Sequence, residues 1–364
     1  MIAGLRSITD RVLGRGEASI TVPSFDGALK PNQILERADV MMNVPLAQDL
    51  ASDGTTLYVA DGSVVKRMDA AGGLVIIRHF NRTLSALAAL PDGRLAVAAG
   101  GREIVVFDPA GGSDIALTSE DFTSVNALAP GPEGTLIASN GSERQSVEHW
   151  AHDLMERGRT GLALSINLET QRINALADGL RYAFGVAQSG EDVLVSESWR
   201  HRVIAVSPRG TRRVVCDDLP AYPSRLSPAA GGGFWLTCFT ARTQLVEFVL
   251  RESGYRRRMM AELDPEFWIA PRLRSGQSFH EPLQGAHVKT MGVMKPWAPP
   301  RSYGLVVRLS ASGLPIYSLH SRVDGTNHGV VAAVEVGDAL YVLAKGPGRL
   351  LRVPLARIEK ELAA

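Results

Sequence analysis

Arg225 and His328 are the side chains best suited to chemistry on a small polar molecule. A guanidinium presents a rigid fork of donors that fits a carboxylate or a developing oxyanion, and the amide of Asn126 could add another hydrogen bond. His328, between Asn327 and Gly329, titrates near neutrality and is the candidate general base. The predicted catalytic residues are therefore His328, Arg225 and Asn126. A histidine of this kind can equally be a hydrogen-bonded structural residue.

Further polar side chains lie near the beginnings of short apolar runs and could hold the rest of a ligand. Asp49 is a carboxylate that could instead pair with Arg225 across a channel, since buried charges are usually paired. Phe184 would supply an apolar wall. The predicted substrate-binding residues are Gln48, Asp49, Ser85, Phe184, Ser224, Asn327, Trp150 and His149.

These residues belong to a pattern that returns six times along the chain. Each unit has an apolar run of small residues, a Gly turn and two further apolar runs, and the units begin near Gln48, Leu87, Asn126, Phe184, Ser224 and Val330. Short strands in units of roughly 40–50 residues are typical of propeller blades. The sequence therefore predicts an all-β fold, a six-bladed β-propeller forming one domain, with the polar residues around its central channel.

Two segments interrupt the repeat and are predicted to cap one mouth of the channel. Residues 142–158 carry apolar side chains at helical spacing, and residues 251–302 show no strand periodicity. The aromatic side chains of these caps could contact substrate or only pack the caps onto the blades. We expect an N-terminal helix and lead-in strand over 1–47, the propeller over 48–355 and a tail over 356–364.

Composition excludes several classes of function. The 364 residues include 39 Lys and Arg against 38 Asp and Glu, a net charge of +1, so no overall field favours nucleic acid. Charges interrupt the N-terminal apolar residues, and no stretch of about 18 apolar residues exists, which predicts no membrane span and a cytoplasmic location. No serine-hydrolase elbow, phosphate loop or dinucleotide fingerprint occurs. The expected partner is a small molecule, and the oligomeric state stays open.

Several motifs give the chain a resemblance to the strictosidine synthase-like family, which includes the adipocyte plasma membrane-associated proteins. Their order and spacing carry the resemblance more than any one of them does. It implies a six-bladed propeller related to paraoxonases and gluconolactonase-type lactonases. The motifs are Gly27-Ala28-Leu29-Lys30-Pro31-Asn32, Tyr182-Ala183-Phe184-Gly185-Val186, Val193-Leu194-Val195-Ser196-Glu197, Tyr222-Pro223-Ser224-Arg225, Gly233-Phe234-Trp235 and Gly304-Leu305-Val306-Val307-Arg308-Leu309.

The lactonases that the chain resembles hold a calcium ion at the channel floor. The resemblance places their ligands at Gln48, Asn126, Phe184 and the pair Ser224-Arg225, where only Asn126 is retained. A Phe donates no oxygen and a guanidinium repels a divalent cation, so we expect no metal and no cofactor.

Strictosidine synthase, also similar, uses a Glu on the innermost strand of its last blade. That position falls at Val331, and Glu335 matches a different position near a turn. We therefore do not expect a condensing lyase. A metal-independent lactone or ester hydrolase is favoured narrowly, and the alternative is a propeller that binds a small molecule without catalysis.

Overall fold

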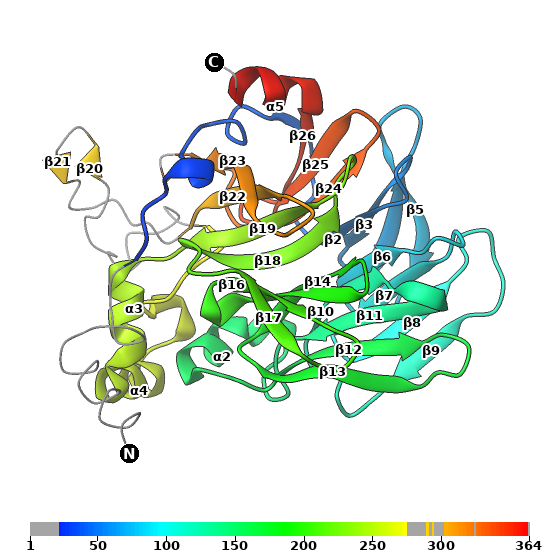
Figure 1. Cartoon of the computed structure of the whole chain (residues 1–364), viewed down its shortest axis with the longest axis horizontal. Coiled ribbons are helices and arrows are strands. Elements are labelled where there is room, and N and C mark those ends of the chain that lie inside the picture. Colours follow the sequence, from blue (N-terminus) through cyan, green and yellow to red (C-terminus); the bar gives the residue numbers. More distant parts are fainter. Residues whose placement is uncertain (1–21, 275–288, 291–292, 295–301, 324, 363–364) are drawn as a thin grey trace.

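The computed structural model describes the chain except residues 1–21, 275–288, 291–292, 295–301, 324 and 363–364. Six four-stranded antiparallel sheets follow one another around a ring, which confirms the predicted all-β propeller (Figure 1). Each blade begins with its innermost strand, and the inner strands of successive blades contact one another. The N-terminal helix expected within residues 1–15 lies outside the described residues.

Each of the first three blades is built from four strands that follow one another in the chain. Blade one is β2 (Ala47–Ser52), β3 (Leu57–Asp61), β4 (Val64–Met68) and β5 (Leu74–His79). Blade two is β6 (Leu84–Ala89), β7 (Leu95–Ala99), β8 (Glu103–Phe107) and β9 (Ile115–Thr118). Blade three is β10 (Val125–Pro130), β11 (Thr135–Asn140), β12 (Gly161–Asn167) and β13 (Ile173–Leu180).

The fourth and fifth blades repeat this order, and the last blade closes the ring. Blade four is β14 (Ala183–Ser189), β15 (Asp192–Glu197), β16 (Arg202–Val206) and β17 (Arg212–Cys216). Blade five is β18 (Ala221–Pro228), β19 (Phe234–Ala241), β22 (Gly304–Leu309) and β23 (Pro315–Ser321). Blade six is β24 (Val330–Val336), β25 (Ala339–Ala344), β26 (Arg349–Pro354) and β1 (Asp39–Asn43).

Strand β1 lies within the segment that the sequence analysis placed before the propeller. It pairs antiparallel with β26, with Asp39 opposite Arg352, and so forms the outer strand of blade six. The ring is thus closed by hydrogen bonds between the two ends of the described chain. The segment predicted as a tail contains helix α5 (Leu355–Leu362), whose Ile358 is buried.

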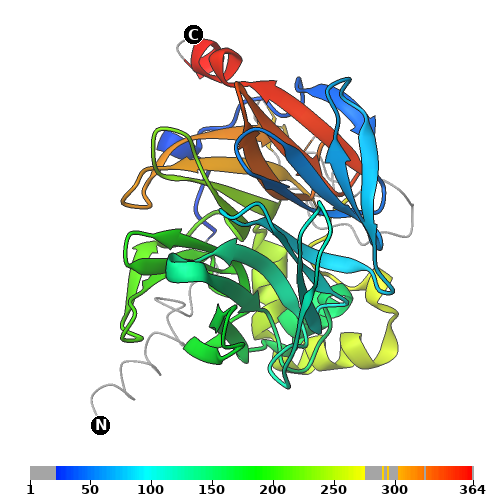
Figure 2. The same cartoon turned by 90° about the vertical axis from the view of Figure 1, so that its right-hand side faces the viewer.

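Two insertions carry the remaining α-helices of the described residues. Between β11 and β12 lie the short helices η4 (Val147–His149) and α2 (Trp150–Glu156). Between β19 and β22 lie α3 (Gln244–Arg251), α4 (Ser253–Glu262), η6 (Pro265–Phe267) and the two-residue strands β20 (Lys289–Thr290) and β21 (Val293–Met294). Helices α2, α3 and α4 gather on one side of the molecule, and α5 lies at the opposite edge from α4 in both views (Figure 1, Figure 2).

The core is divided between the blades because each sheet buries both of its faces. Small and branched residues such as Ala86, Ala96 and Ile104 pack between blades two and three. Two buried serine hydroxyls among these strands bond across to the next blade. Ser139 on β11 donates to the Phe184 carbonyl at 2.5 Å, and Ser196 on β15 donates to the Ser224 carbonyl at 2.5 Å. These bonds tie blade three to blade four and blade four to blade five.

Candidate functional site

A β-bulge interrupts the beginning of every innermost strand. The register between each inner strand and its neighbour shifts at the same place in all six blades. A bulged residue leaves the regular ladder and its side chain is re-aimed, in this case toward the channel. The residues within these shifts that face one shared cavity are Gln48, Ser85, Asn126, Phe184, Arg225 and Val331.

We call this hollow the capped cavity. Its volume is about 40 Å³, and Val147 and Trp150 from one insertion and Leu273 from the other complete its wall. Such a space holds only a few water molecules. A larger molecule can enter only if part of the cap moves.

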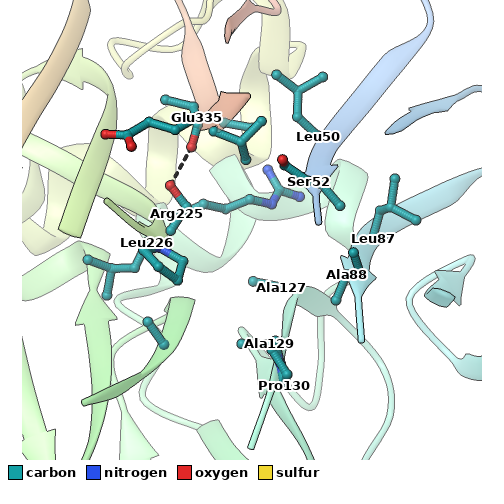
Figure 3. A pocket seen from close by; sticks show the side chains of 18 of the residues that line it. Leu50, Ser52, Leu87, Ala88, Ala127, Ala129, Pro130, Arg225, Leu226 and Glu335 are labelled. Carbon is teal, nitrogen blue, oxygen red and sulfur yellow. Dashed lines mark hydrogen bonds between the residues drawn. The ribbon is translucent and has the colours of Figure 1, made fainter. Parts of the chain in front are cut away.

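Arg225 lies between the capped cavity and a second cavity in the same channel. The second cavity has a volume of about 490 Å³ and is lined by the later parts of the inner strands, where alanine is the commonest residue (Figure 3). We call it the alanine-lined cavity. Arg225 lines both cavities, whereas Asp49 lines only the alanine-lined one. The guanidinium therefore separates two spaces within one channel.

The Arg225 guanidinium makes contacts to four blades. Its Nε lies 3.0 Å from Asp49 Oδ1 of blade one, an ion pair in which the N–H is not aligned for a hydrogen bond. One terminal nitrogen donates to the Val331 carbonyl at 3.2 Å and the other to the Ser85 carbonyl at 2.6 Å. The Phe184 ring lies under the guanidinium carbon at 5.2 Å, a cation–π contact. The structure therefore contains the ion pair between Arg225 and Asp49 that the sequence analysis gave as an alternative.

Both carboxylate oxygens of Asp49 are engaged by neighbouring groups. It accepts from the Leu50 amide at 2.8 Å and the Leu87 amide at 2.9 Å in addition to the ion pair. Burial raises the pKa of Asp49 to about 6, against the opposing effect of the Arg225 charge. Burial likewise lowers the pKa of Arg225, because the charged form is desolvated.

The other polar bulge residues hold neighbouring blades together. Asn126 Nδ2 donates to the Ala183 carbonyl at 3.0 Å, which uses one of its two N–H groups. Ser85 Oγ donates to the Val125 carbonyl at 2.7 Å. Both side chains face the capped cavity while they make these bonds, so their positions are fixed.

Lys345, which the sequence analysis did not select, also lines the capped cavity. It follows the end of β25, and its Nζ donates to Gln48 Oε1. Desolvation, with repulsion from Arg225 as the second cause, lowers the pKa of Lys345 to about 8. The signal in the sequence was a lone lysine directly after the buried apolar run Ala339–Ala344.

Aromatic rings form much of the wall of the capped cavity. Tyr182 stacks on Trp199 with ring centroids 4.4 Å apart, and Phe239 lies edge to face with Trp150 at 5.3 Å. The indole of Trp199 donates to the buried Asp153 on α2 at 2.7 Å, which anchors the cap to blade four. The Tyr182 hydroxyl is buried and makes no hydrogen bond of normal geometry among the described residues. The predicted contact of Trp150 with the channel is thus present.

Several predicted residues are not part of this cavity. His328 lines neither cavity, and its two ring nitrogens contact Ser302 Oγ and the Arg322 carbonyl, each at 2.7 Å. Asn327 donates to the Leu35 carbonyl at 2.9 Å, which ties the lead-in segment to blade six. The predictions of a general base at His328 and of a ligand contact at Asn327 are therefore not supported by the geometry.

Ser224 and His149 are also outside both cavities. The Ser224 hydroxyl is fully buried and bonds to Thr237 Oγ1 at 2.7 Å. His149 is exposed and contacts Ser146 Oγ at 3.0 Å. Both residues have structural partners in place of the predicted ligand contact.

The residues at the family's calcium positions do not fit a calcium ion. Arg225 and Lys345 bring two cationic groups into the capped cavity, and the carboxylate of Asp49 is committed to Arg225. A hard divalent cation needs several oxygen ligands, preferably anionic. Among the described residues, no group of three or more His, Cys, Asp or Glu side chains could hold a metal ion.

The fold defines the class of architecture: a six-bladed β-propeller. The chain is homologous to the adipocyte plasma membrane-associated proteins, which confirms the resemblance seen in the sequence. The relative from Salmo salar is 24% identical over 343 residues, covering 85% of this chain and 75% of that protein. The human relative is 25% identical over 277 residues, covering 66% of each. No protein-family model matches the chain.

Solved structures show the same fold at low sequence identity. A gluconolactonase from Xanthomonas campestris has a TM-score of 0.55 at 14% identity, covering 86% of this chain and 88% of that one. A regucalcin from Agrobacterium tumefaciens, described as a calcium-binding protein, has a TM-score of 0.54 at 14% identity, covering 87% and 92%. These likenesses establish the architecture alone. None of the helices in the described residues is long and apolar enough to cross a membrane.

Proposed function

We propose that this protein is a metal-independent hydrolase of a small lactone or ester and that its reaction site is the capped cavity. The observation that carries the proposal is Lys345, an amine with a pKa lowered to about 8, facing the same small space as Arg225 and Asn126. An amine that is partly neutral near physiological pH can accept a proton from water. The architecture shared with gluconolactonases supports a lactone as the substrate class.

The step needs only groups that this chain supplies. Neutral Lys345 takes one proton from water while the water oxygen bonds to the substrate's carbonyl carbon. The carbonyl oxygen becomes an oxyanion near Arg225 and the second N–H of Asn126. The acyl C–O bond then breaks, and the Lys345 ammonium returns its proton to the leaving alkoxide. Water has been added across that bond.

Substrate binding requires the cap to move, since the cavity of about 40 Å³ is too small for a lactone ring. Trp150 and Val147 are on the helical insertion, and Leu273 is on the other one. Opening and closing of such a lid would also exclude bulk water during the reaction.

The second candidate is a propeller that binds a small polar molecule in this cavity without turnover. It is favoured by the absence of a histidine among the described residues that line the cavity and by the engagement of Arg225 with three acceptors. In this case Lys345 and Arg225 would hold an anionic group as fixed charges.

The test is hydrolysis of δ-valerolactone, dihydrocoumarin and p-nitrophenyl acetate by the wild type, with EDTA or added calcium as further conditions. We expect turnover that EDTA and calcium leave unchanged, and a loss of about 100-fold or more in kcat for Lys345→Met. Lys345→Arg should be equally inactive, because a guanidinium stays protonated.

Lys360→Met is the matched control, since Lys360 is an exposed lysine on α5. Full activity of Lys345→Met would show that Lys345 is not the general base. Turnover that EDTA abolishes would overturn the metal-free mechanism. Saturable binding of these compounds without any turnover would establish the second candidate.

A further inference from the structure

The alanine-lined cavity has the size and composition of a small-molecule site. Its volume of about 490 Å³ falls within the range of about 300–1,000 Å³ typical of ligand pockets. The inner strands of blades one, two, three, four and six each contribute alanine, and blade five adds alanine directly after β18. Larger side chains at these places would fill the channel, so the small residues create the space.

The charged groups in its wall are already compensated. Asp49 and Arg225 form the ion pair at its inner end. The Glu335 carboxylate accepts from the Trp235 indole at 2.5 Å and from the Ala230 amide at 2.6 Å. A charged ligand would have to compete with these contacts or bring an unpaired charge into an apolar space, which is unfavourable. The wall therefore selects for an uncharged molecule.

Among the polar side chains of this wall, Gln188 carries a buried acceptor that no described group satisfies. Ser227 donates to the Ala333 carbonyl, and Ser52 accepts from the Gly54 amide at 2.9 Å. Gln188 donates through its nitrogen to the Gly190 carbonyl at 2.7 Å, but its buried side-chain oxygen has no hydrogen-bond partner within the described residues. A buried acceptor without a partner costs free energy that a ligand's O–H or N–H could recover.

We propose that the alanine-lined cavity binds an uncharged, mainly apolar small molecule that carries one hydrogen-bond donor, of the size of a bicyclic aromatic alcohol. This site is separate from the capped cavity, because Arg225 lies between the two. The proposal does not depend on the hydrolase reaction. Figure 3 shows the alanine-lined cavity in which we place the ligand. Leu50, Leu87 and Leu226 lie around it, and Arg225 reaches into it.

The experiment measures binding of 2-naphthol to the full chain at pH 7 by calorimetry. We expect saturable binding of one equivalent, with 2-naphthalenesulfonate, the matched anion, binding at least tenfold more weakly. Ala89→Trp should weaken 2-naphthol binding at least tenfold, since Ala89 is a half-buried part of the wall and an indole would occupy the space. Ala110→Trp, the same change at an exposed turn of blade two, is the matched control and should bind normally.

Two further variants keep the test decisive if Ala89→Trp does not fold. Gln188→Leu should weaken 2-naphthol about three- to tenfold, the usual effect of losing one hydrogen bond. Lys345→Met should bind 2-naphthol as the wild type does, because Lys345 lines only the capped cavity. Absence of saturable binding would overturn the proposal. Loss of binding in Lys345→Met with retention in Gln188→Leu would move the site to the capped cavity and overturn it as well.

Discussion

Arg225 and Asp49 meet across the channel with Nε and Oδ1 3.0 Å apart, and both side chains are almost completely buried. Blade five supplies the cation and blade one the anion, so the pair joins blades that are not neighbours in the ring. Removing either partner leaves a buried charge without compensation. The pair is therefore a structural support of the channel as well as the boundary between two cavities.

The first prediction concerns this pair. Asp49→Asn and Arg225→Met should each lower the free energy of unfolding by about 3–5 kcal/mol, measured by urea denaturation. The double variant should lose less than the sum of the two, with a coupling of at least about 1 kcal/mol. The exposed pair Asp178 and Arg212, at 2.7 Å, is the matched control and should couple by less than about 1 kcal/mol. An equal coupling free energy in the two pairs would contradict the structural role of the ion pair between Arg225 and Asp49.

The second prediction concerns the stability effect of Lys345. Below pH 8 the folded protein carries a partly desolvated ammonium, so Lys345→Met should raise the melting temperature at pH 7. The unfolded lysine keeps its ordinary pKa of 10.5, so between pH 8 and 10.5 the unfolded state binds more protons and wild-type stability rises with pH.

The advantage of Lys345→Met should therefore shrink as the pH rises from about 8 to about 10. Melting curves at a series of pH values for wild type, Lys345→Met and Lys360→Met measure this difference in melting temperature. A Lys345→Met variant that is less stable than the wild type at pH 7 would show that the lysine is a structural residue. Higher stability combined with lost activity would identify a group retained for function.

The third prediction separates His328 from the reaction. His328→Ala should lower the free energy of unfolding by about 1–3 kcal/mol, because Ser302 and the Arg322 carbonyl each lose a partner. Hydrolysis in the assay above should stay within about threefold of the wild type. A loss of activity of 100-fold with unchanged unfolding would instead restore His328 as the general base.

The fourth prediction tests the bonds between blades. The Ser196 hydroxyl accepts from the Gly185 amide at 2.7 Å and donates to the Ser224 carbonyl at 2.5 Å. Ser196→Ala should therefore cost about 1–3 kcal/mol in urea denaturation, since buried partners are left unsatisfied. Ser312→Ala, an exposed serine in a turn, should change stability by less than about 0.5 kcal/mol. Similar small effects in both variants would contradict the predicted importance of this bond.

The repeat in the sequence was sufficient to predict the ring because each unit carries its own apolar periodicity and turns. The same pattern located Gln48, Asn126, Phe184 and Arg225, which the structure brings to one cavity. The local sequence pattern did not show which of these polar side chains would form hydrogen bonds to a neighbouring blade. The pairing of Arg225 with Asp49 was one of two hypotheses, and the structure contains this ion pair.

Lys345 was missed for a different reason. It follows the second strand of its blade, whereas the repeat indicates channel-facing positions on the first strands. Its side chain reaches Gln48 of blade one, and that contact depends on the closure of the ring. His328 was selected by residue type at the beginning of an inner strand. Its two ring nitrogens contact Ser302 and the Arg322 carbonyl, which no local pattern indicates.

The bulges at the beginnings of the six inner strands also bear on how this architecture can change during evolution. A residue at a bulge is not part of the regular ladder of hydrogen bonds, so its replacement leaves strand pairing largely intact. Six such positions surround one space, and each can be exchanged separately. A ring of this kind can therefore lose an ion ligand, gain a buried guanidinium or admit an aromatic wall by single substitutions while the strand order of the blades stays the same.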